Sequence, residues 1–307
     1  MDVAALLIGA RFAVYATILA AFGIALFGDD RRGDAATDVT APSGALLATL
    51  ALTGAVASVA QILAMAASMA GVGISGLDRA TLMDLIAASA IGYAWLLRIG
   101  ALIAVALAAL ALRRFPKTMR ATSFVGATIA VATLAWTGHG AMDDGAIGWF
   151  HLMADIVHLL AAGAWLGAIV SLLLLLRPGA SGLGQVAHAH QALDRFAVTG
   201  TLLVALIIAT GVANMWLLVG WSHLMSLGTA DYGRLLLLKL ALFSAMLGLA
   251  AANRFRLTPA LGRAVVIGDS VAASAALRRS LVTELTCVVS ILALVAWLGT
   301  LSPPTSM

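Results

Sequence analysis

The sequence of 307 residues has little charge and almost no cysteine. Asp, Glu, Lys and Arg make up 10% of it, against roughly a quarter in soluble domains, and 62% of the residues are hydrophobic. A soluble protein of this length could not bury so much apolar surface. The single cysteine, Cys287, excludes a disulfide framework within the chain. These shortages exclude a soluble globular protein and indicate a membrane protein.

Long apolar runs replace the missing charge. Several reach about 20 residues, the length a helix needs to cross ~30 Å of hydrocarbon, and the alternating segments of a membrane barrel are not seen. The sequence predicts an all-α, polytopic membrane protein with eight transmembrane helices in a single membrane domain, residues 1–307. The first run lacks a basic flank and is expected to be retained rather than cleaved. The predicted spans are 3–27, 44–68, 88–112, 121–138, 147–176, 194–221, 232–252 and 279–300.

Lysine and arginine are distributed unevenly between the two sides of these spans. Thirteen flank the four loops on one side, the other side has only Arg79, and four more lie within spans. Because positive loops stay in the cytoplasm, both termini are expected outside it. We interpret the excess of basic residues as a topology signal and expect membrane lipids, and no nucleic acid, as partners.

The predicted span 147–176 carries three groups that lipid disfavours. His151, Asp155 and His158 are spaced i, i+4 and i+7, so a helix places them on one face. The two histidines are about 10 Å apart along the helix axis. One metal ion with ligand bonds of ~2 Å cannot bind both, so they represent two stations, or a ligand and a relay.

Methionine and histidine gather on the side opposite the basic loops. Nine of eleven methionines and four of six histidines fall there. Thioether and imidazole together suit Cu(I) or Cu(II), although a single methionine or histidine in a membrane helix is often a packing residue. The candidate ligands besides the three residues above are His139, His223, Met142, Met225, Met65 and Met69.

Buried charges need partners, because a carboxylate within a membrane is costly. Asp155 is expected to contact Arg11 or Lys239 as a structural ion pair, or else to have a direct metal or proton role. Arg98 and Glu284 are expected to form an inner pair.

The basic loops contain two further features. His188 and His190 are expected in a cytoplasmic loop, where they are either a metal-release site or simply solvated. Residues 254–277 form a loop long enough for an interfacial helix, although its pattern is weak.

Three segments resemble the copper resistance protein D family. They are HLMADIVHLLAAGAWLGAIV at 151–170, YGRLLLLKLALFSAMLGLAAANRFRLTP at 232–259 and RRSLVTELTCVVSILALVAWLGTLSPP at 278–304. The resemblance implies a multi-pass protein of the bacterial inner (cytoplasmic) membrane that moves or handles copper. It also implies a separate periplasmic CopC-like copper-binding partner.

Three functions fit these observations. The first is copper transport or homeostasis, with copper taken from the periplasm toward the cytoplasm. No Walker A or DKTGT-type segment occurs, so transport would be passive or ion-coupled, with Asp155 as a candidate proton group. The chain is not expected to be an enzyme. The alternatives are a b-type haem electron carrier, which needs two facing imidazoles, and a non-transporting copper sensor or scaffold.

Overall fold

A computed structural model describes residues 2–27, 44–111, 114–138, 145–176, 183–220, 227–228 and 230–301. The described part is helical and contains no strand. Its helices are α1 (Val3–Phe27), α2 (Gly44–Ala70), α3 (Arg79–Ala88), α4 (Ala90–Ala111), α5 (Pro116–Ala132), α6 (Gly145–Leu175), α7 (Leu183–Val219), α8 (Asp231–Ala252), α9 (Thr258–Ile267) and α10 (Val271–Leu298). Three short pieces join them: 3₁₀ turns η1 (Ile74–Gly76) and η2 (Thr133–Thr137), and the π-helical turn η5 (Asn253–Leu257).

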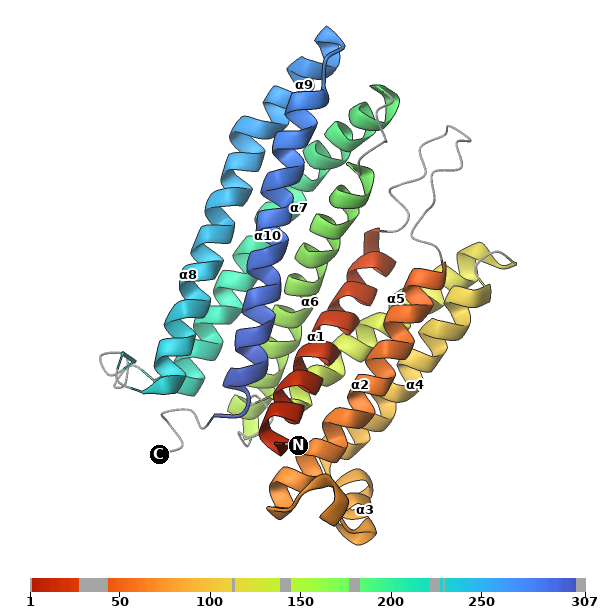
Figure 1. Ribbon diagram of the computed structural model, residues 1–307, viewed down its shortest axis with the longest axis vertical. Coiled ribbons are helices and arrows are strands. Elements are labelled where there is room, and N and C mark those ends of the chain that lie inside the picture. The colour runs from red at the N-terminus through yellow and green to blue at the C-terminus, as the bar shows by residue number, and fades with distance from the viewer. Residues whose placement is uncertain are drawn as a thin grey trace.

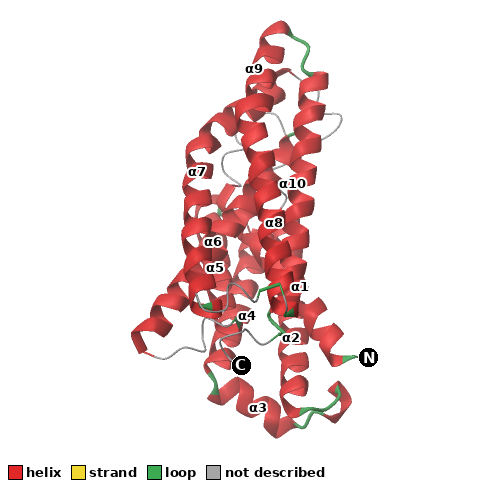
Figure 2. Cartoon of the chain, turned by 90° about the vertical axis from the view of Figure 1, so that its left-hand side faces the viewer, coloured by secondary structure: helices red, strands yellow, loops and turns green. Residues whose placement is uncertain are grey.

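The long helices form one elongated bundle (Figure 1). Eight helical stretches of the described chain are long and apolar enough to cross a membrane, which confirms the predicted class and number of spans. The start of α1, the end of α10 and α3 lie at one end of the bundle, and α9 lies at the other (Figures 1 and 2). We call these the terminus end and the α9 end.

Helix α1 occupies the centre of the bundle, packed against α2, α5, α6 and α10. Its closest approach is to α6, where a methyl group added to Gly23 would overlap the backbone of Gly167, and the reverse. Gly163 lies one turn away and faces Leu19 and Phe22. Small residues allow such backbone contact in membranes, and here they fix the position of the helix that carries the polar residues.

The chain at the α9 end differs from the prediction. The expected loop around His188 and His190 is wrong, because α7 begins at Leu183 and includes both residues. The segment 254–277 is also mostly helical, since α8 continues through η5 into α9. Pro259 is near the start of α9, where its missing N–H is tolerated, and Gly268 ends that helix with φ of 84°.

A short helix that the sequence did not predict caps the terminus end. In α3, the Asp78 carboxylate accepts hydrogen bonds from the backbone N–H and the hydroxyl of Thr81, both at 2.8 Å. These bonds lower the pKa of Asp78 below its usual range, so the N-cap stays ionised. Leu85 of α3 packs on Ile62 and Ala66 of α2.

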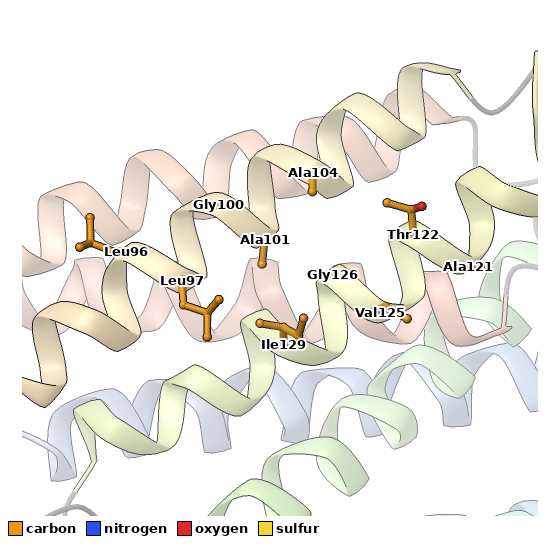
Figure 3. A pocket seen from close by; sticks show the side chains of 10 residues that line it. All are labelled: Leu96, Leu97, Gly100, Ala101, Ala104, Ala121, Thr122, Val125, Gly126 and Ile129. Carbon is orange, nitrogen blue, oxygen red and sulfur yellow. The ribbon is translucent and has the colours of Figure 1, made fainter.

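A groove of about 630 Å³ runs between α4 and α5 (Figure 3). The side chains drawn there come from both helices and are almost all carbon, with the Thr122 hydroxyl as the one oxygen. The groove offers no imidazole, thioether or carboxylate to a metal ion.

Candidate intramembrane polar site

The polar face of α6 is matched by a polar face on α7. The amide of Asn214 donates to Asp155 Oδ1 at 2.5 Å, and His158 Nδ1 lies 2.9 Å from Thr210 Oγ1. The two helices run in opposite directions, so residues later in α6 face residues earlier in α7. The four side chains form a continuous seam within two apolar helices.

The hydroxyl of Thr210 sets the tautomer of His158. Thr210 Oγ1 donates its single proton to the carbonyl of Leu206, one turn back, at 2.6 Å. Its oxygen therefore accepts from His158, which places the imidazole proton on Nδ1 and the lone pair on Nε2. A neutral imidazole held in this way is the form that binds a metal ion.

The third helix at this seam is α8. Lys239, which is half-buried, lies within electrostatic range of both Asp155 and His158, and Tyr232 lies within range of Asp155. Helix α8 packs mainly against α10, and its Tyr232 shares an apolar cluster with Val219 of α7. The site thus joins one carboxylate, one imidazole and one ammonium group from α6 and α8.

His151 is fully buried near the start of α6. The register of the two bonds between α6 and α7 places it level with residues 217–218 of α7. The order His151, Asp155, His158 therefore leads from the terminus end into the bundle.

Arg11 lies beside Thr137 and Gly299. Its guanidinium donates to the carbonyl of Thr137 at 3.1 Å. It also packs against Gly299 and occupies the space that a side chain at this position would need. Gly138, the next residue, faces Asp155, since a methyl group there would be 3.6 Å from Oδ2. A direct pair of Asp155 with Arg11 or Lys239 stays a prediction.

The other predicted ligands do not join this seam in the described structure. His139, Met142, His223 and Met225 lie outside the described residues. Met65 is half-buried and Met69 is exposed, both on α2, which packs mainly against α1 and α4. Within the described ranges, no group of three His, Cys, Asp or Glu side chains could hold a metal ion. The full ligand set stays a prediction.

The predicted pair of Arg98 and Glu284 is wrong. Arg98 is fully buried and donates to the hydroxyl and carbonyl of Thr133 and, at 3.4 Å, to Gln61. Glu284 instead accepts from Asn253. The prediction matched the two charged residues by their estimated depth alone. Helices α4 and α10 face different neighbours, so neutral oxygens and amides form the hydrogen bonds of Arg98 and Glu284 instead.

The histidines of α7 belong to the α9 end. His190 Nδ1 lies 3.2 Å from Asp194 Oδ2, and its ring packs against Gly262 of α9. Of His188, only its place in α7 is described. His190 is therefore far along the bundle from His158.

Sequence inspection did not identify Thr210 as a functional residue. It is a common residue in membrane helices, and its role depends on facing His158 across the interface of α6 and α7. A weak signal existed, because Thr210 and Asn214 are four residues apart and so share a face of α7.

The fold and the site together define a class: an all-α, multi-pass membrane protein with ionisable side chains buried between its spans. Residues 1–149 match the family described as "Copper resistance protein D-like, N-terminal domain", and residues 190–298 match "Copper resistance protein D". The chain belongs to the copper resistance protein D family.

Two relatives cover most of the chain. It is 40% identical over 302 residues to "Copper resistance protein D" of Pseudomonas syringae pv. tomato, which covers 96% of both chains. It is 28% identical over 254 residues to "Inner membrane protein YebZ" of Escherichia coli (strain K12), which covers 82% of this chain and 84% of the relative. No solved structure matches the chain.

Proposed function

We propose that this protein carries copper ions across the bacterial inner membrane, from the periplasm toward the cytoplasm, along the polar face of α6. The single observation that carries the proposal is the hydrogen-bonded pair of His158 and Thr210 inside a membrane-spanning bundle, which favours the metal-binding tautomer of the imidazole. Membership of the copper resistance protein D family supports copper as the ion. The name of the Escherichia coli relative supports the inner membrane as its place.

The chemistry of the path suits stepwise transfer of a soft or borderline cation. His151 is the first ligand, with His139, His223, Met142, Met225, Met65 and Met69 as candidates to assist it at the terminus end. Imidazole nitrogen and thioether sulfur both bind copper, and exchange between few ligands keeps each binding step weak enough to reverse. A separate periplasmic copper-binding protein would deliver the ion.

Asp155 and Lys239 balance charge along this path. When no cation is bound, the ammonium group of Lys239 offsets the carboxylate of Asp155. A copper ion that reaches His158 brings a second positive charge next to Lys239 and must share Asp155 with it. This competition limits how long the ion stays, as transport requires.

The deciding experiment is copper uptake by the purified protein in proteoliposomes. We expect copper to enter vesicles that contain the protein faster than protein-free vesicles. A protein that binds copper but moves none would be a sensor or scaffold, and a reduced-minus-oxidised haem spectrum would identify an electron carrier instead.

Thr210 provides a test of the seam. Replacing it by valine, which has nearly the same shape, removes the hydrogen bond that orients His158. We expect copper affinity and uptake to fall about 10- to 100-fold, the usual cost of losing a partner that orients a metal ligand. Uptake by the purified variant measures this.

The matched control is Thr128→Val on α5. Thr128 also donates to a carbonyl one turn back, that of Phe124, but its helix contributes no residue to the seam. Equal loss in both variants would mean that valine harms the fold rather than the site.

Topology is testable independently. Thirteen basic residues flank the loops on one side, so both termini should be periplasmic. A C-terminal alkaline phosphatase fusion should be active and a C-terminal GFP fusion dark. A fluorescent GFP fusion would reverse the direction assigned to the path.

A further inference from the structure

Glu284 is the only glutamate in the sequence, and it is buried inside the bundle. It lies on α10 with 3% of its surface exposed. Its carboxyl group accepts a hydrogen bond from the side-chain amide of Asn253, and the indole of Trp165 on α6 lies beside it. Both partners are neutral, so neither balances a negative charge.

The side-chain oxygen of Asn253 indicates that Glu284 carries a proton. Asn253 Oδ1 is buried and, within the described residues, has no hydrogen-bond donor. An ionised carboxylate has none to offer. A protonated carboxyl group can donate to Oδ1 while it accepts from the amide, which closes a two-bond ring between acid and amide and satisfies every polar atom of the pair.

Asn253 lies at a break in helical regularity. It is the first residue of the π turn η5, six residues before Pro259. Pro259 lacks an N–H and its ring crowds the carbonyl four residues earlier, which accounts for the widened turn. Such turns leave backbone groups less tightly bonded and often occur at functional positions.

No cation is paired with Glu284 in the described structure. The nearest basic residue along the chain from Asn253, Arg254, directs its guanidinium to Ala197 and Thr201 of α7. The ionisable residues on the described elements that pack against α10, and on α10 itself, are Arg11, Tyr15, His151, Asp155, His158, Asp231, Tyr232, Arg234, Lys239, Arg254, Arg256, Arg263, Arg278, Arg279 and Cys287. None of these described residues forms a hydrogen bond or an ion pair with the carboxyl group.

The same face of α6 leads from the polar site to Glu284. Trp165 lies seven residues after His158, so the two side chains share a face about 10 Å apart along the axis. A path along this face that passes His158 therefore continues toward the buried carboxyl group and the α9 end.

We propose that Glu284 is an intramembrane proton-binding site, and that release of its proton toward the α9 end is coupled to the passage of copper. The step transfers one proton from the carboxyl group to water and forms or breaks no other covalent bond. The coupling rests on the proposed function, whereas the proton site does not.

Infrared spectroscopy of protein labelled with ¹³C-glutamate tests the proton site directly. Because Glu284 is the only glutamate, an isotope-sensitive carboxylic acid band must come from it. We expect that band at neutral pH in the unmodified protein and its absence in Glu284→Gln. An isotope-sensitive carboxylate signal at neutral pH, with no acid band down to mildly acidic pH, would overturn the proton site.

Copper uptake by proteoliposomes, measured over a series of pH values, tests the coupling. With Cu(I) as the probe, we expect the uptake rate of the wild-type protein to change by up to about tenfold per pH unit, the limit for a single titrating group. Glu284→Gln mimics the protonated acid and keeps the bonds to Asn253, so it should stay folded but lose this dependence. Glu284→Asp should retain part of it.

The two proposals can fail separately. If Glu284→Gln keeps the wild-type pH dependence, the coupling is overturned. If the wild-type protein takes up no copper, the proposed function and the coupling both fail, while the infrared band still decides the proton site.

Discussion

Cells that carry His151→Ala together with His158→Ala should accumulate copper only at the level of cells without the protein. The two imidazoles lie on one face of α6, and the hydrogen bond with Thr210 leaves the lone pair of His158 on Nε2. Loss of both removes each station of the path, so we expect more than about a tenfold fall in uptake, at least the cost of losing a partner that orients a ligand. Copper content per cell, corrected for membrane abundance, measures it.

His190→Ala is the matched control for this double variant. His190 packs against Asp194 and α9, away from the seam, so its loss should change uptake far less. Wild-type accumulation in a well-expressed double variant would mean that His151 and His158 serve packing alone.

Replacing Gly23 by valine should prevent the bundle from assembling. The backbones of Gly23 and Gly167 touch, and a side chain on either would have to enter the other helix. Overpacking normally costs about 1–3 kcal/mol, and we expect a value at or above the top of this range because backbone, unlike a side chain, cannot move aside. The variant should show low abundance and early thermal aggregation in detergent.

Gly9→Val on the same helix serves as the control. A methyl group at Gly9 meets nothing within 4 Å, so this change tests the helix propensity of valine without the contact. If both variants were equally stable, α1 and α6 would not pack through their glycines.

The number and class of spans followed from composition, because the thickness of the bilayer sets the length of an apolar run independently of its neighbours. The positions of helices at the α9 end did not. Apolar length identifies the part of a helix inside lipid, whereas α7 and the continuation of α8 extend beyond it, where solvent and packing decide the backbone.

The sequence by itself determined that His151, Asp155 and His158 share one face, since helical periodicity is local. Only the tertiary structure decided what meets that face: Thr210 and Asn214 from α7, with Lys239 within electrostatic range. It also separated Arg98 from Glu284 and gave them Thr133 and Asn253 as partners. The physical reason is that contacts between helices depend on their relative rotation and register, which the close approach of Gly23 to Gly167 helps to set and which spacing within one helix does not encode.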